Sequence, residues 1–178
     1  MTQRQATAVR SLCLGLATLL GVALLANGVF MLVSPDAWYV AVPGVTTTGP
    51  FNQHFLRDIG LIFLFLGGAF LVGVTRPDLR VVFWAAPTLW LSGHALFHFW
   101  EVAVGICSSS AIPRDFPAVT LPAIIGLVLT LWAVANSRTV FSNSVPRGAQ
   151  RGAETTLFHE ASVKLPKERA CLAVDVVP

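Results

Sequence analysis

Long apolar blocks separated by short polar segments run along most of this chain. Four blocks reach the length of about 20 residues that a helix needs to cross the hydrocarbon core of a bilayer. They are Ser11–Val33, Phe55–Val74, Val81–Trp100 and Phe116–Ala135. After Ala135 the residues mix Ser, Arg, Glu and Gly without periodicity. The pattern predicts an all-α integral membrane four-helix bundle over residues 11–135, with a short N-terminal segment (1–10) and a disordered cytoplasmic tail (136–178).

The composition supports a membrane protein. Of the 178 residues, 54% are hydrophobic and only 12% are charged, and the mean hydropathy is +0.70. Soluble domains average about 25% charged residues. The sequence contains no glycine-rich phosphate loop, nucleophile elbow or paired-cysteine motif, and no strong basic patch for nucleic acid. We therefore assign no catalytic residue, leave open whether the protein is an enzyme, and predict no nucleic-acid partner. The predicted partners are the lipid bilayer and either another membrane subunit or a second copy of the chain.

The first apolar block also has to be compared with a cleaved signal peptide, because the basic start "MTQRQATAVR" precedes it. The block runs for 23 residues, whereas the apolar region of a signal peptide has about 7–15. Leu24 is bulky where a cleavage site needs a small residue. We expect a retained membrane helix.

The arginines indicate the orientation of the four spans. They precede the first block (Arg4, Arg10), occupy the turn "TRPDLR" between the second and third (Arg76, Arg80), and follow the fourth (Arg138, Arg147, Arg151). The other two connections contain only Arg114. By the positive-inside rule, both termini and the "TRPDLR" turn are cytoplasmic. The predicted location is a bacterial inner membrane, crossed several times.

Two further features concern packing. The external connection "SPDAWYVAVPGVTTTGPFNQ" is rich in Pro and Gly, and we expect turns or a short interfacial segment there. Small residues recur at i, i+4 spacing in Ala17/Gly21 and in Ala69/Gly73. Such pairs let membrane helices approach closely, although they are also common as ordinary membrane-helix residues.

Ionisable residues gather at the external ends of the second and third spans. His94, His98 and Glu101 lie within about 60° of one another around a helix of 3.6 residues per turn, and His54 and Asp58 share a face at i, i+4. The short "TRPDLR" turn predicts that these two spans are antiparallel neighbours. The two polar stripes should then meet in the outer third of the bilayer.

Three explanations of this predicted patch stay open. Imidazoles and carboxylates from facing helices suit a divalent transition metal, held by His54, Asp58, His94, His98 and Glu101 with Arg57 and Asn27 around them. A haem or a quinone, or a proton-binding pocket, would use the same histidines. The third explanation is a non-catalytic accessory or structural subunit, in which the polar groups only stabilise helix packing.

The chain also resembles the DoxX-like group of small four-helix bacterial membrane proteins. The likeness covers roughly residues 11–135 and consists of "GVFMLVSPDAWY", then "VPGV", then the charged entry "RDIGLIFLFLGG" into the second span. The resemblance implies a four-helix membrane fold and, for some members, a link to quinone-coupled oxidoreductase complexes. No motif of the group matches His94, His98 and Glu101, so the resemblance assigns no site residue.

Overall fold

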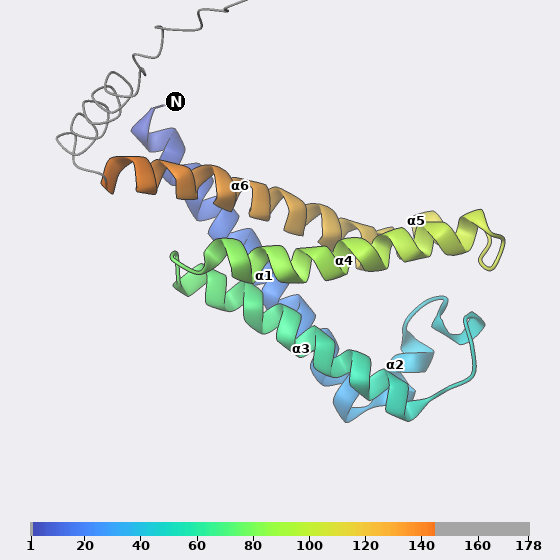
Figure 1. Cartoon of the computed structure of the whole chain (residues 1–178). Coiled ribbons are helices and arrows are strands. Elements are labelled where there is room, and N and C mark those ends of the chain that lie inside the picture. Colours follow the sequence, from blue (N-terminus) through green and yellow to red (C-terminus); the bar gives the residue numbers. More distant parts are fainter. Residues whose placement is uncertain (1, 145–178) are drawn as a thin grey trace, which may run out of the picture. The chain divides into compact units, whose positions relative to one another are not determined.

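Helices account for most of the chain in the computed structural model, which describes residues 2–144, with side chains up to residue 137. The elements in order are α1 (Gln3–Val33), α2 (Pro35–Ala41), the 3₁₀ turn η1 (Val45–Thr47), α3 (Gln53–Thr75), α4 (Arg80–Ala103), α5 (Ala111–Asp115), the π-helical segment η2 (Phe116–Thr120) and α6 (Leu121–Ser144). The all-α prediction is confirmed for these residues (Figure 1). The predicted disordered tail, from residue 145 onward, lies outside the described residues.

Local sequence signals explain where the helices begin. Thr2 and Gln5 form a reciprocal capping box at the start of α1, so the helix begins well before the apolar block. The side chain of Asn52 accepts a hydrogen bond from the backbone N–H of Phe55 and caps α3. Pro35 occupies the first position of α2, where its missing N–H costs nothing. The connection between α1 and α3 therefore contains short helical pieces, as expected from its composition.

Three helical stretches are long and apolar enough to cross a membrane. They are Gln3–Val33, Gln53–Thr75 and the continuous helical stretch Ala111–Ser137. They indicate a multi-pass protein associated with the lipid bilayer. The helix α4 has the position and length of the third predicted span, but its composition is less apolar and it is not among the three.

Glycines hold α1 and α3 in close antiparallel contact. A Cβ added at Gly67 would lie 2.6 Å from the carbonyl oxygen of Gly21, and one at Gly28 would lie 2.7 Å from that of Gly60. The two contacts are one heptad apart on both helices. Backbone packs on backbone here, as small residues permit in membrane helices. Ala17, one turn from Gly21, is fully buried, so the predicted Ala17/Gly21 pair does lie in an interface.

The helices α4 and α6 form a second antiparallel pair. The hydroxyls of Thr88 and Thr130 lie 3.1 Å apart, and a Cβ at Gly126 would collide with Thr88. The rings of Trp84 and Trp132 are 6.1 Å apart. Together these contacts give α4 and α6 one shared interface.

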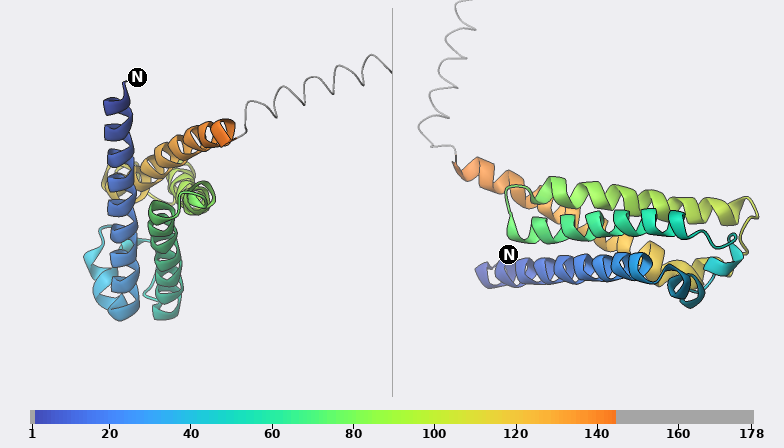
Figure 2. Two further views of the ribbon diagram at one scale, coloured as in Figure 1. Left: turned by 90° about the vertical axis from the view of Figure 1, so that its left-hand side faces the viewer. Right: turned by 90° about the horizontal axis from the view of Figure 1, so that it is seen from below.

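The pair α1/α3 and the pair α4/α6 meet near the turn between α3 and α4. The indole Nε1 of Trp84 donates a hydrogen bond of 3.0 Å to the carbonyl of Phe70. Further along, the rings of Phe63 and Trp90 make an edge contact at 5.5 Å. Beyond it the two helices diverge, α3 staying beside α1 while α4 continues beside α6 (Figures 1 and 2).

The unit formed by residues up to Ser137 thus has two ends. We call the end with residues 2–10 and the α3–α4 turn the turn end. The opposite end, with residues 34–52 and 104–115, is the loop end (Figure 2).

Candidate functional site

The candidate site at the loop end is centred on Asp115, the last residue of α5. Its carboxylate accepts two hydrogen bonds from the guanidinium of Arg114, at 2.7 Å from Nε and 3.0 Å from Nη2. Its Oδ2 also lies 3.4 Å from Nδ1 of His98 on α4. The Asp115 side chain is only 15% exposed, so burial by its neighbours strengthens these charge-assisted contacts. One carboxylate therefore joins α5 to α4.

Aromatic rings continue the site along α4. The ring of His94 lies edge-on to that of His98 with 4.7 Å between centroids, and it stacks on Trp90 at 5.1 Å. Trp90 in turn contacts Phe63 of α3. His94 and His98 therefore lie on one face of α4, as predicted. This face leads from the loop end toward the point where α3 and α4 meet.

A small pocket adjoins His98 and Asp115. Its other lining residues are mostly apolar and come from the end of α4, the connection that follows, and α5–η2: Phe99, Val102, Cys107, Ala111, Ile112, Val119 and Thr120. The cavity has a volume of about 10 Å³, roughly the space of one water molecule, so it is a small gap between the end of α4 and α5.

The connection between α1 and α3 also reaches this site. Gly44 has a φ of +87°, which favours glycine, and a Cβ there would collide with the guanidinium of Arg114. Tyr39 holds the same connection in place, because its hydroxyl donates a 2.7 Å hydrogen bond to the carbonyl of Gly49. The guanidinium of Arg114 thus donates to Asp115 and lies close to Gly44 of the connection.

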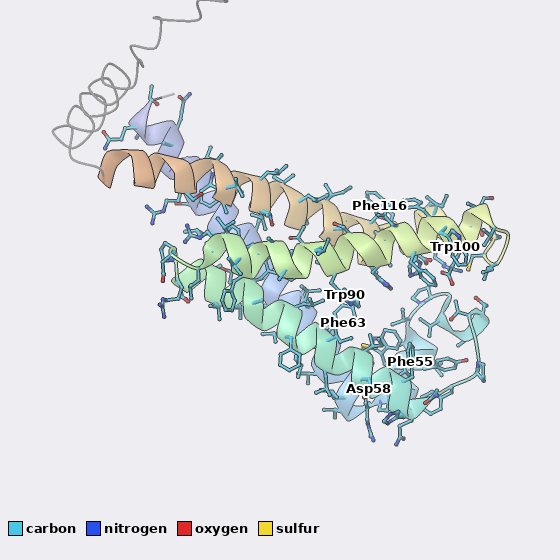
Figure 3. The ribbon with its side chains drawn as sticks, viewed as in Figure 1. Phe55, Asp58, Phe63, Trp90, Trp100 and Phe116 are labelled. Atoms are coloured by element: carbon cyan, nitrogen blue, oxygen red, sulfur yellow. The ribbon has the colours of Figure 1, made fainter. Side chains whose placement is uncertain are left out.

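The predicted residues of α3 lie away from this site. His54 and Asp58 pair with each other at 3.3 Å, and their side chains are 91% and 57% exposed. In Figure 3, Phe55 and Asp58 lie on α3 well apart from Trp100 and Phe116, while Phe63 and Trp90 lie close together. The contacts of Phe70 with Trp84 and of Phe63 with Trp90 follow the antiparallel register expected from the short turn. The divergence of the helices, not the register, separates the two polar pairs.

The remaining predicted neighbours make other contacts. Arg57 donates through Nε to the carbonyl of Leu32, 3.2 Å away, at the end of α1. Asn27 accepts a 2.9 Å hydrogen bond from the indole of Trp38 in α2. The side chain of Glu101 makes no hydrogen bond or ion pair with any described residue. Neither Arg57 nor Asn27 therefore surrounds the histidines, as the metal hypothesis required.

This geometry does not support the metal hypothesis. Within residues 2–144, no group of three or more His, Cys, Asp or Glu side chains is placed to hold a metal ion. The five predicted ligands are instead divided between the exposed pair on α3, the two histidines on α4, and Glu101. Zinc sites use three protein ligands when catalytic and four when structural, all converging on one point.

The prediction omitted Arg114 and Asp115, which the structure places at the centre of the site. Both were assigned to a connecting loop. Their position in the sequence could have indicated a site. Both lie directly before the fourth apolar block, shortly before Pro117. Charged residues at the entry of a membrane span need polar partners, as His54 and Asp58 do.

No family model matches the chain, and no similar protein was found among curated proteins or among solved structures.

Proposed function

We propose that the chain is a four-span protein of a bacterial inner membrane with both termini cytoplasmic, and that it belongs with the DoxX-like proteins that it resembles. The fourth span in this proposal is α4, besides the three apolar stretches. Its polar residues Arg80 and Thr88 are buried against neighbouring helices. Its other face carries Val82, Leu89 and Leu96, which are 66%, 76% and 68% exposed. Apolar residues spaced by seven form a continuous stripe suited to lipid.

Within this membrane protein we propose a non-catalytic, accessory role in which the polar residues join the helices and the external segments. One observation carries this proposal: the contacts of the charged residues at the loop end connect different elements in pairs. Arg57 connects α3 to α1, Asp115 connects α5 to α4, and Arg114 connects α5 to the external connection at Gly44. A surface organised in this way can present a defined face to another membrane subunit.

The pair of His98 and Asp115 supports a second candidate, the binding of a lipophilic carbonyl compound such as a quinone. Asp115 lies at Nδ1 of His98, and a carboxylate in that place fixes the imidazole and leaves Nε2 for a ligand. The adjoining cavity of about 10 Å³ would have to widen to admit a ring.

One experiment separates the two candidates. The purified protein, His98→Leu and the control His54→Leu are compared for quinone binding, by quenching of tryptophan fluorescence with a short-chain quinone, and for thermal stability. His54 is exposed at the same end of the molecule and lies outside the pocket. A structural role predicts no saturable quenching in any of the three proteins and a lower melting temperature for His98→Leu alone.

Saturable quenching of the wild type that His98→Leu abolishes and His54→Leu retains would establish the quinone candidate. Equal stability of His98→Leu and the wild type, without quenching, would contradict both candidates. Metal analysis and an absorption spectrum of the same wild-type sample test for a metal or haem directly.

A further inference from the structure

A second charged region lies at the turn end, around Arg80 at the start of α4. This guanidinium is buried, with only 8% of the residue exposed. Its Nε donates to the carbonyl of Gly73 at 2.8 Å and its Nη2 to that of Val74 at 3.2 Å. Both carbonyls belong to the last turn of α3, where a cation is favoured by the helix dipole. Arg80 therefore caps α3 from the neighbouring helix.

Two tryptophans lie beside the guanidinium. Its central carbon lies 5.4 Å from the ring of Trp84 and 5.8 Å from that of Trp132, within the range of cation–π contact. The two carbonyls accept hydrogen bonds from Nε and Nη2. Nη1 of Arg80 has no hydrogen-bond partner among the side chains and backbone that the structure describes.

Arg10 of α1 brings a second positive charge to this place. The glycine contacts of Gly21 with Gly67 and of Gly28 with Gly60 set a register in which position 10 lies opposite position 78, beside the α3–α4 turn. Position 78 is two residues before Arg80, so Arg10 lies at the same end of the molecule as Arg80. Arg10 is exposed and makes no ion pair with any described side chain. Two like charges near each other repel, and an anion between them removes that repulsion.

The other charges at the turn end do not supply that anion. Asp78 is bound to Arg76 by hydrogen bonds of 3.3 and 3.2 Å from Nε and Nη2. The guanidinium of Arg76 holds the pKa of the Asp78 carboxyl below its usual value, so Asp78 stays ionised and paired at neutral pH. Among the described residues the turn end thus carries one aspartate against four arginines, Arg4, Arg10, Arg76 and Arg80.

We propose that Arg10 and Arg80 bind the phosphate of an anionic phospholipid headgroup at the turn end, between α1 and the α3–α4 turn. Basic sites between membrane helices on the cytoplasmic side are suited to such headgroups, and the cytoplasmic leaflet is rich in anionic lipid. The buried and capped Arg80 gives the site a fixed donor, whereas the exposed Arg10 closes over the headgroup. The exposed apolar side chains Leu12 and Leu16, which follow Arg10 along α1, offer a surface for an acyl chain.

The test uses the full-length protein in detergent with an equimolar mixture of phosphatidylglycerol and phosphatidylcholine, and native mass spectrometry measures the ratio of the two lipids retained. The wild type is expected to enrich phosphatidylglycerol. Arg10→Gln should reduce that enrichment about fivefold, since one arginine near a membrane surface is worth about 1 kcal/mol of lipid binding. Arg10→Lys should keep most of it, because the charge is retained.

Arg76→Gln is the matched control, because Arg76 lies at the same end but is already paired with Asp78. It should enrich phosphatidylglycerol as the wild type does. No enrichment by the wild type, or equal losses in Arg10→Gln and Arg76→Gln, would overturn the site. Inorganic phosphate should not raise the melting temperature as phosphatidylglycerol does, and an equal increase with phosphate alone would refute a lipid as the ligand.

Discussion

Close contact between α1 and α3 leads to a sharp prediction for Gly67→Ala. The new Cβ would lie 2.6 Å from the carbonyl oxygen of Gly21 and 2.8 Å from the backbone nitrogen of Leu25. Real Cβ atoms do not approach backbone atoms so closely, and α1 cannot yield at one point without moving as a helix. The two helices must therefore separate locally and lose contact on both sides of the substitution.

The neighbouring Gly68 provides the matched control for Gly67→Ala. A Cβ at Gly68 meets no atom within 4 Å, yet it belongs to the same turn of α3. Replacing glycine by alanine inside a helix stabilises it by up to about 1 kcal/mol, and this term is common to both variants. Overpacking costs about 1–3 kcal/mol. Gly67→Ala should therefore be less stable than Gly68→Ala by about 1–3 kcal/mol.

A third variant, Gly60→Ala, tests an intermediate degree of crowding between α1 and α3. At Gly60 the nearest atom to a new Cβ is the Cβ of Met31 at 3.0 Å, a milder conflict than at Gly67. The melting temperatures, followed by tryptophan fluorescence in one detergent, should fall in the order Gly68→Ala, Gly60→Ala, Gly67→Ala. For a chain of this size about 2–4 °C corresponds to 1 kcal/mol. Gly67→Ala at least as stable as Gly68→Ala would refute the close packing of α1 on α3.

Three other predictions follow from the fold. A reporter at Thr47 should be external and one fused after Ala135 cytoplasmic, whereas the same compartment for both would contradict four spans. Thr88→Val should lower the free energy of unfolding by about 1 kcal/mol, because Thr130 loses its partner, and Thr130→Val added to it should restore part of that loss. A loss in the double variant equal to the sum of the losses in Thr88→Val and Thr130→Val would show that the two hydroxyls are not coupled. Truncation after residue 145 should leave membrane insertion and melting temperature nearly unchanged, and loss of the protein from the membrane would contradict this.

The helices were predictable from the sequence because they depend on local pattern. Apolar blocks of sufficient length marked α1, α3 and α6, and the four-residue turn after Thr75 indicated that α3 and α4 are neighbours. The contact of Phe63 with Trp90 even follows the expected register. Each of these conclusions needs only residues that are close together along the chain, or one short connection.

The composition of the site was not predictable in the same way. Whether Asp58 meets His98 depends on the angle between α3 and α4, and that angle follows from which partner each helix packs against more closely. The glycines of α1 and α3 decide it on one side, and Thr88 with Gly126 on the other. Asp115 was missed because the path of the connection between α4 and α5 determines whether it returns to His98. Small differences in packing between distant segments are not encoded in any local pattern.

The π-helical segment η2, between Asp115 and α6, links the phase of one helix to the composition of the site. A π-helical turn holds one residue more than an α-helical turn, and the residues on its two sides are out of the phase of a regular α-helix. Deleting one residue within Phe116–Thr120 would let the stretch close as an ordinary α-helix. Because the π-helical turn takes about one residue more than the 3.6 residues of an α-helical turn, that deletion would leave Asp115 nearly in its present direction relative to α6. A deletion in the regular part of α6 would instead turn Asp115 by about 100° away from His98, so η2 is the one place here where the chain can lose a residue and keep this contact.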